Sequence, residues 1–267
     1  MRQNAALALS LIFLGSIAAN AAEFAPQQSA KPEKTVIKNY AVDYFGVVPG
    51  MNPEEVRTAL AVNFNTLKLS AQDKVLPMKV GGDVLTSQHY TAELAGKFIS
   101  ELQDNSFHGY FSSPSSGNQL VGFEQSMIYH TRFDAPNVGK VVNFFGQKFG
   151  EPSQINRDGD TLHLVWIYKN NELQHCSFVE PCPTATVEYA TDRLKYYLAS
   201  NPTDFIVVAD ISRRKDVPLV SQVNVKMLDL KKRSQVAKID NEIFTQETAR
   251  LVDQHPPVAP LPAGQAH

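Results

Sequence analysis

The sequence predicts an α+β fold in which helices pack on one face of a mostly antiparallel sheet. Alternation of apolar and polar residues, as in 161–168 (TLHLVWIY), is typical of strands that have one buried face. Segments with apolar residues at helical spacing, such as 138–149, are interspersed among these strands. Stretches rich in Pro, Gly, Asn and Ser, such as 114–118, join neighbouring strands as in hairpins.

A strand and a helix are the first predicted elements. Residues 36–48 are rich in β-branched and aromatic side chains, which predicts a strand. A helix then begins after Asn52, because Asn52, Pro53 and Glu55 have the spacing of a capping box with proline at the first helical position. The carboxylates of Glu54 and Glu55 stabilise the positive end of this helix. They point about 100° apart and so do not converge as an acid–base pair.

The middle of the chain is expected to hold a second helix and a hairpin. The helix is predicted over 91–103, because Leu94 and Phe98 recur at helical spacing. The hairpin consists of the β-rich arms 108–113 and 117–133.

The second half of the chain repeats the order of strand and helix. Asp134 is expected to cap a helix that ends at Gly150. The apolar face of this helix comprises Val138, Val141, Val142, Phe145 and Phe149. Strands are expected, in order, over 161–168, 185–189, 205–212 and 218–227. Residues 193–200 fit a helix or a strand, and a closing helix is predicted from about Leu230 to Leu251.

Composition divides the chain into five segments. They are a signal peptide (1–22), a flexible lead-in (23–35), a first α+β unit (36–118), a second α+β unit with the C-terminal helix (119–254) and a Pro-rich disordered tail (255–267). Both units begin with a strand and a capped helix, so a tandem repeat of strand-helix-strands units is a hypothesis. The prolines of the tail exclude a helix, and a polyproline II ligand is the alternative to a plain tail.

The first residues predict export. Arg2 precedes an apolar run of roughly a dozen residues, and Ala19-Asn20-Ala21 fits the cleavage pattern of a secretory signal peptide. Removal of Arg2 leaves 24 Lys and Arg against 27 Asp and Glu. This balance argues against nucleic acid or an anionic membrane as a partner. We therefore expect a periplasmic protein with no transmembrane segment in the mature chain, and secretion outside the cell is the alternative.

Two cysteines, Cys176 and Cys182, are expected to form a disulfide in the oxidising compartment that this implies. The closed loop is short, so the disulfide contributes about 2 to 2.5 kcal/mol. A zinc site with His175 or a redox pair fits less well, because the spacing supplies neither four ligands nor a C-x-x-C motif.

No motif for a nucleophile, a metal or a nucleotide occurs in the sequence. Asn156, Asp158 and Asp160 alternate like the start of a calcium loop, but Gly159 is misplaced and no Glu follows at the twelfth position. The histidines are scattered, with none at i,i+4 spacing. The sequence thus predicts no catalytic residue, no metal ligand and no cofactor, and it leaves the presence of an enzymatic site undecided while favouring none.

Two groups of residues are candidates for partner binding. Trp166 and Tyr168 would form an exposed aromatic patch on a bare sheet face, or else line the core under the preceding helix. Arg213 and Arg214, with Lys215, form a basic hairpin tip that suits an anionic partner or a solvated turn.

Several motifs resemble known envelope proteins. The stretch FGVVPGMNPEEVRTAL (45–60) resembles the helix start of the small outer-membrane-assembly lipoproteins, whose fold is similar to that of the β-lactamase-inhibitor protein. KFGEPS (148–153) followed by VWIY (165–168) is similar to the second part of that signature. Asn52 stands where Thr is usual, and the lipid-bearing Cys is absent. YFSSPSSGNQ (110–119), with the later motifs and the Cys pair, also resembles a segment of uncharacterised exported proteobacterial proteins.

The resemblance implies an envelope protein that binds other proteins. We therefore expect a non-enzymatic role in protein binding or envelope assembly, with an envelope protein as partner. The alternatives are a periplasmic hydrolase whose site is assembled only in three dimensions, and a secreted inhibitor or host-directed factor. A deep pocket with His, Asp or Glu side chains in hydrogen-bonding reach would favour the enzyme. An exposed aromatic surface would favour binding.

Overall fold

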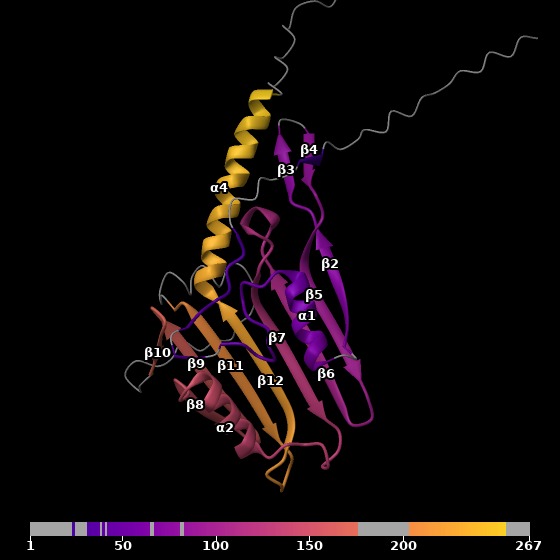
Figure 1. Ribbon diagram of the computed structural model, residues 1–267, viewed down its shortest axis with the longest axis vertical. Coiled ribbons are helices and arrows are strands. Elements are labelled where there is room, and N and C mark those ends of the chain that lie inside the picture. The colour runs from indigo at the N-terminus through magenta and orange to yellow at the C-terminus, as the bar shows by residue number, and fades with distance from the viewer. Residues whose placement is uncertain are drawn as a thin grey trace, which may run out of the picture.

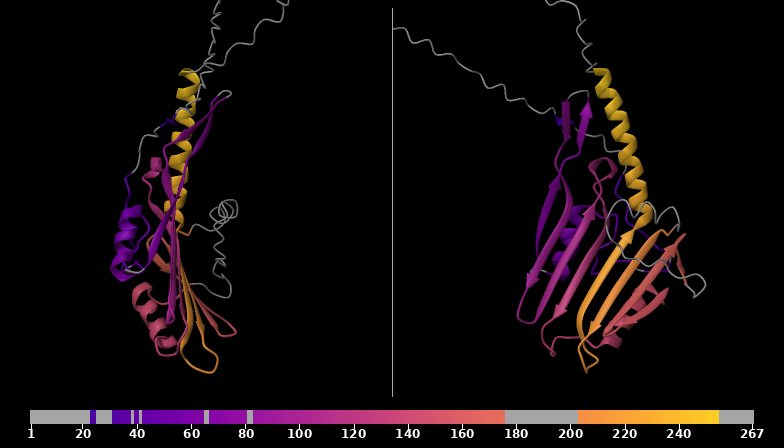
Figure 2. Two further views of the ribbon diagram at one scale, coloured as in Figure 1. Left: turned by 90° about the vertical axis from the view of Figure 1, so that its right-hand side faces the viewer. Right: turned by 180° about the vertical axis from the view of Figure 1, so that it is seen from behind.

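The protein is described by a computed structural model, which covers residues 23–24, 31–37, 39–40, 42–64, 67–80, 83–175 and 203–254. A nine-stranded antiparallel sheet forms its centre (Figure 1). Helices α1 (Pro53–Asn63) and α2 (Val138–Phe149) lie on the same side of this sheet (Figure 2). Helix α4 (Leu230–Gln254) follows the last strand and leads away from the sheet (Figure 1). The predicted α+β class is confirmed.

The main sheet has the strand order β10-β9-β11-β12-β7-β6-β5-β2, and β8 also pairs with β9. Its strands are β2 (Lys68–Lys74), β5 (Tyr90–Ile99), β6 (Gln103–Phe111), β7 (Leu120–Tyr129), β8 (Gln154–Asp158), β9 (Thr161–Lys169), β10 (Glu172–Gln174), β11 (Phe205–Arg213) and β12 (Val220–Asp229). A separate small sheet has the order β1-β4-β3 and comprises β1 (Glu23–Phe24), β3 (Pro77–Val80) and β4 (Asp83–Ser87).

Strands from both predicted units belong to this one sheet. Strand β6 of the range 36–118 pairs with β7 of the range 119–254, with Ser106 opposite Ser126. Strand β7 pairs in turn with β12, with Gly122 opposite Leu228. The two units therefore share a continuous sheet.

Most strands of the second half are confirmed. The hairpin β6–β7 turns through the short 3-10 helix η1 (Pro114–Ser116), and β8 and β9 join at the Asp158–Gly159 turn. Strands β11 and β12 form the predicted hairpin. The predictions for 185–189 and 193–200 fall outside the described residues.

The helix predicted over 91–103 is wrong, because this segment holds strand β5 and the turn into β6. Leu94 is buried and Phe98 packs against the core, as the spacing required. A step of four residues returns to the same face of a strand as well as of a helix. Ile99 and Leu102 are exposed instead of lying on that face.

The strand predicted over 36–48 is also wrong. The backbone makes tight turns with isolated bridges, between Ile37 and Tyr40 and between Tyr44 and Val47. Phe45 has a positive φ of 50°, which lies outside the β region. Most apolar residues of this segment are buried in the core, among them Tyr44 and Val47, although Val36 is 74% exposed. Their composition therefore indicated burial and not an extended conformation.

The cap of α2 differs from the prediction. Asn137 and not Asp134 caps the helix, because its Oδ1 accepts a hydrogen bond from the Gly139 N–H at 2.8 Å. Asp134 instead accepts a bond from the hydroxyl of Thr131. The predicted end at Gly150 is confirmed, with φ 85° at that residue.

The start of α1 is built as the sequence predicts. Asn52 Oδ1 accepts the Glu55 N–H at 2.9 Å, and Glu55 Oε2 accepts the Asn52 N–H at 2.9 Å. This hydrogen bond from the Asn52 backbone lowers the pKa of Glu55, and Lys34 lowers it further. The carbonyl and amide groups around Gly50 and Met51 bond to those of Leu120, which ties the helix start to β7.

Replacing Asn52 with Ala is expected to lower the free energy of unfolding by about 1 kcal/mol, because the Glu55 N–H loses its side-chain partner. Chemical denaturation measures this loss. Asn52→Ser keeps an acceptor and serves as the control. Equal losses in both variants would contradict the assignment of the cap.

Helix α4 begins where Asp229 ends β12. Asp229 Oδ1 accepts the Lys232 N–H at 2.6 Å, and Thr35 donates its hydroxyl to the same carboxylate. Burial raises the pKa of Asp229. Val236 of this helix is buried, and Ser113 donates a hydrogen bond to Asp240. No helix in the described ranges is long and apolar enough to cross a lipid bilayer.

Candidate functional site

The predicted aromatic pair on β9 is not on the surface. Trp166 and Tyr168 have no exposed surface, and both lie in the core under α2. The alternative of an exposed partner-binding patch therefore fails for these two residues, and their alternation marks the buried face of the sheet.

The same two side chains hold the end of α2. Trp166 Nε1 donates to the Gly150 carbonyl at 2.8 Å, and the Tyr168 hydroxyl donates to the Phe149 carbonyl at 2.6 Å. The last carbonyls of a helix have no partner within it, so these bonds complete the helix terminus. The motifs KFGEPS and VWIY are thus two halves of one structural contact.

The basic hairpin tip is held by hydrogen bonds to the protein itself. Arg213 Nε lies 2.6 Å from Asp160 Oδ1. Arg214 donates from Nη2 to the carbonyls of Tyr129 and Thr131, which anchors the tip of β11 to the end of β7. These contacts support the solvated-turn interpretation over an anionic partner.

The disulfide prediction for Cys176 and Cys182 lies outside the described residues. Within the ranges that the structure describes, no group of three or more His, Cys, Asp or Glu could hold a metal ion.

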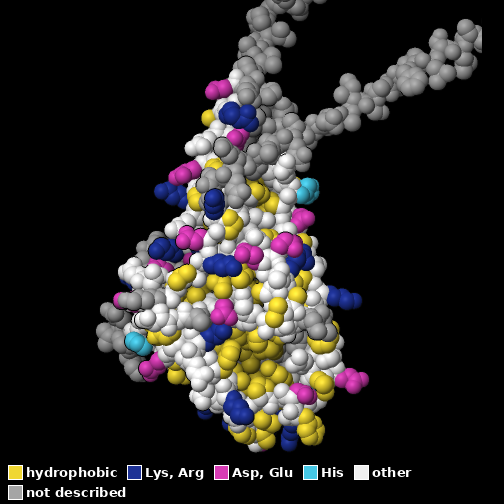
Figure 3. All heavy atoms as spheres, viewed as in Figure 1, with side chains coloured by type: hydrophobic (Ala, Val, Ile, Leu, Met, Phe, Trp, Pro, Cys, Tyr) yellow, Lys and Arg dark blue, Asp and Glu magenta, His cyan; other side chains and the backbone are white. Residues whose placement is uncertain are grey.

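A groove lined by apolar side chains lies on the helix-covered side of the sheet. We call it the aromatic groove; its volume is about 260 Å³. It is lined by Tyr44, Phe45, Met127, Tyr129, Pro136, Lys140, Val141, Phe144, Phe145 and Val223. Figure 3 shows hydrophobic side chains gathered at this level of the molecule, between α1 and α2. The groove lies over the ends of β7 and β12 that are far from α4.

Aromatic rings form the walls of the groove. The rings of Tyr44 and Phe145 are stacked with centroids 5.9 Å apart, and Phe144 meets Phe145 edge-on at 5.4 Å. Phe144 is 42% exposed although it is a large apolar residue in a helix. Lys148 lies 5.7 Å above its ring and forms an ion pair with Asp43 at 3.0 Å. This wall is therefore held in place by packing within the protein.

A tight turn contributes Tyr44 and Phe45 to the lining of the groove. Phe45 has a positive φ, and the Gly46 N–H bonds to Asp43 Oδ2 at 3.0 Å. The turn directs Tyr44 into the core, while Phe45 meets the ring of Phe64 edge-on at 4.8 Å. Burial raises the pKa of Tyr44, so its phenol stays neutral at physiological pH.

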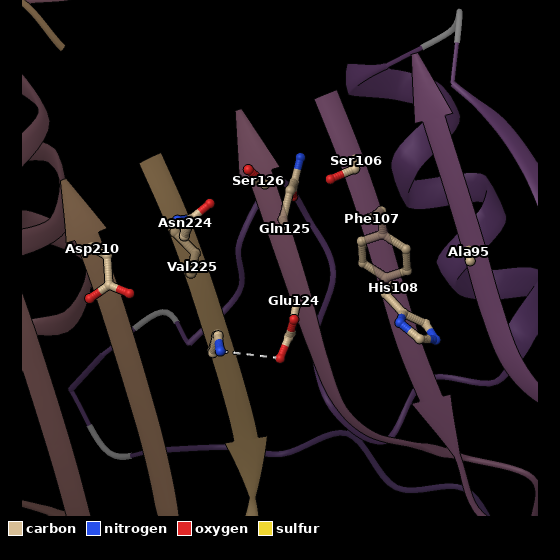
Figure 4. A pocket seen from close by; sticks show the side chains of 11 residues that line it. Ala95, Ser106, Phe107, His108, Glu124, Gln125, Ser126, Asp210, Asn224 and Val225 are labelled. Atoms are coloured by element: carbon tan, nitrogen blue, oxygen red, sulfur yellow. Dashed lines mark ion pairs between the residues drawn. The ribbon is translucent and has the colours of Figure 1, made fainter. Parts of the chain in front are cut away.

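Part of the opposite face of the sheet carries polar side chains, and we call this part the polar face. Asp210, Asn224, Ser126, Glu124 and His108 project from four neighbouring strands into a shallow hollow of about 540 Å³ (Figure 4). The ion pair of Lys226 with Glu124 spans 3.4 Å.

Carboxylate–histidine pairs recur on the polar face. His108 Nε2 lies 2.9 Å from Glu93 Oε2, and His163 Nδ1 lies 2.7 Å from Asp210 Oδ1. His130 pairs with Asp104 at 3.0 Å. Strand register brings these residues together. Two of the pairs join neighbouring strands, and the third joins β6 to the residue that follows its neighbour β7.

The network around Glu93 does not supply an activated nucleophile. The Tyr110 hydroxyl lies 3.1 Å from His108 Nδ1, so the order carboxylate, imidazole and phenol resembles a catalytic relay. Burial, together with Glu124 and Glu93, raises the pKa of Tyr110 to about 12. The phenol therefore keeps its proton, and the network is better explained as cross-strand stabilisation of a wet sheet face.

Replacing Glu93 with Gln is expected to remove a pH-dependent part of the stability. Lys74, at 2.6 Å, and His108 lower the pKa of Glu93 in the folded state. The Glu93 carboxylate stabilises the fold fully at pH values above its pKa in the unfolded chain. This stabilisation is lost as the pH falls through the lowered pKa of the folded state. We expect Glu93→Gln to cost up to about 1 kcal/mol at neutral pH and progressively less in acid.

Denaturation at a series of pH values measures the Glu93 effect. Glu101→Gln, in the exposed turn between β5 and β6, is the matched control. A loss from Glu93→Gln that grows toward acidic pH would contradict the sign.

The aromatic groove was missed in the sequence, although one signal was present. Phe144 lies next to Phe145 and off the predicted apolar face of α2. A phenylalanine outside the apolar stripe of a helix indicates a second contact surface.

Comparison of the chain with protein-family models, curated proteins and solved structures found no match.

Proposed function

We propose that the protein is an exported, non-enzymatic binding protein of the cell envelope, and that the aromatic groove holds a segment of another protein. The single observation that carries the proposal is the groove itself, which is lined by aromatic rings and methionine and in which Phe144 is 42% exposed. The signal-peptide pattern and the resemblance to envelope proteins support the location.

The lining matches the chemistry of protein-binding surfaces. Aromatic residues and methionine are enriched in protein interfaces, and lysine is depleted at their centres. Here Tyr129, Phe144 and Met127 contribute to the groove, and Lys140 is the one ionisable cation in its lining. A volume of about 260 Å³ suits a few side chains of a peptide more than a whole folded surface.

The hydrolase alternative has less support. The carboxylates and imidazoles of the polar face pair with each other, and the hydroxyl that reaches His108 is a phenol with a raised pKa. The hollow there is shallow and lies on the solvated face of an antiparallel sheet.

The proposal predicts that Phe144→Asp abolishes partner capture. A charge in the groove would have to be desolvated when the partner binds, so we expect at least tenfold weaker binding. Crosslinking and affinity capture from envelope extracts would compare wild type, Phe144→Asp and Ile155→Asp. Ile155 is 58% exposed on the edge strand β8 and is the matched control. Identical captured proteins for all three would overturn the proposal.

A further inference from the structure

The aromatic groove has a candidate occupant within the chain. We propose that it binds the proline-rich segment 256–262 (PPVAPLP) of a second copy of this protein. This inference rests on the proposed function, because it names the partner class of the same groove.

The lining of the groove suits proline-rich ligands. Grooves that bind such segments are walled by aromatic rings, against which proline rings pack. The aromatic side chains of the lining are Tyr44, Phe45, Tyr129, Phe144 and Phe145, and Pro136 also lines the groove. The carbonyls of a polyproline helix need hydrogen-bond donors from the binding surface, because this conformation has no internal hydrogen bonds. Lys140 and the hydroxyl of Tyr129 are such donors.

The segment has the matching sequence pattern. Pro257 and Pro260 are three residues apart, which is one turn of a polyproline helix and places both rings on one side. The residues between them are Val258 and Ala259, and no charged residue occurs from 256 to 262. An uncharged proline-rich segment is complementary to a groove with an almost entirely apolar lining.

The groove of the same molecule is out of reach. Pro260 is six residues after Gln254 in the sequence, so this stretch spans at most about 22 Å. Helix α4 has 25 residues, which makes it about 37 Å long, and it leads away from the sheet (Figure 1). Val223 in the groove lies toward the opposite end of β12 from the start of α4. A proline-rich tail that occupies the groove must therefore come from another molecule.

Such a contact joins different surfaces of two copies. It is heterologous, so copies can associate head to tail or exchange tails reciprocally. A buried area well below that of a standard interface predicts weak, reversible association that depends on concentration.

Fluorescence anisotropy with a labelled peptide of residues 254–265 tests the binding directly. We expect the peptide to bind the full-length protein and the Ile155→Asp control equally. Binding should weaken at least tenfold with Phe144→Asp, with Lys140→Glu, and with a peptide that carries Pro257→Ala and Pro260→Ala. Lys140 is exposed, so its variant remains informative if Phe144→Asp fails to fold.

Sedimentation of the full chain supplies the second readout. We expect the average mass of wild type to rise with concentration and that of the Pro257→Ala/Pro260→Ala variant to stay monomeric. Absence of peptide binding, or binding that is indifferent to Phe144 and Lys140, would overturn the inference. If the peptide does not bind but Phe144→Asp no longer captures an envelope protein that the wild type captures, only the tail is refuted as the occupant of the groove. If both assays are indifferent to Phe144, the proposed function falls as well.

Discussion

Replacing Trp166 with Ala is expected to lower the free energy of unfolding by about 3–5 kcal/mol. The side chain has no exposed surface, and its ring lies 5.4 Å from that of Phe149 and 5.9 Å from that of Phe145. Its removal leaves a cavity between the sheet and α2. It also leaves the Gly150 carbonyl without the indole donor.

Two milder variants separate these contributions. Trp166→Phe keeps most of the ring contacts and loses the hydrogen bond, so a smaller loss of about 1–3 kcal/mol is expected. Tyr168→Phe removes the hydroxyl that bonds to Phe149 and should cost about 1 kcal/mol. Because Trp166 is the single tryptophan, unfolding must be followed by circular dichroism instead of indole fluorescence. A Trp166→Ala loss no larger than that of Trp166→Phe would contradict the packing argument.

The second large effect is expected from Gly50→Ala, with a loss of at least about 2–4 kcal/mol. Gly50 has φ +96°, and a Cβ atom there would lie 1.9 Å from the Glu33 carbonyl oxygen. Two backbones would have to separate, since no flexible side chain is available to move. The displacement would also strain the 2.7 Å hydrogen bond from the Gly50 N–H to the Leu120 carbonyl.

Two other glycines serve as controls, one for the cost of a positive φ and the other for replacement where the Cβ atom meets no neighbour. Gly159 has φ +53° with open space around the Cβ position, so Gly159→Ala should cost only about 1–2 kcal/mol. Gly146, inside α2 and also in open space, should gain up to about 1 kcal/mol on replacement by Ala. Denaturant midpoints of the three variants give the comparison. A Gly50→Ala loss equal to that of Gly159→Ala would show that the close approach to Glu33 has no energetic weight.

Strands with one buried face could be predicted from the sequence, whereas segments whose conformation is set by tertiary packing could not. Alternation around Trp166 identified β9, because the sheet buries every second side chain there. Leu94 and Phe98 led to the wrong prediction of a helix over 91–103, because residues four apart share one face in a strand as well as in a helix. The turn at Phe45 gave no signal, because its apolar residues serve tertiary packing.

The candidate surfaces depend on register and exposure, which single-sequence patterns do not contain. His163 and Asp210 are 47 residues apart and meet only through the pairing of β9 with β11. The aromatic groove exists only because Phe144, Tyr129 and the turn at Phe45 lie near one another and leave a space between them. Asn52 could be assigned correctly because a helix cap is formed by residues within one turn.

The pairing of β7 with β12 has a consequence for the order of folding. The hairpins β5–β6–β7 and β11–β12 close over short loops, but Gly122 and Leu228 pair across about a hundred residues of chain. Closing so long a loop is entropically costly and slow, so local hairpins form before the two halves of the sheet join. Until β12 arrives, β7 presents a bare strand edge in the middle of the future sheet. A newly made chain is therefore most prone to aggregation before this central seam closes.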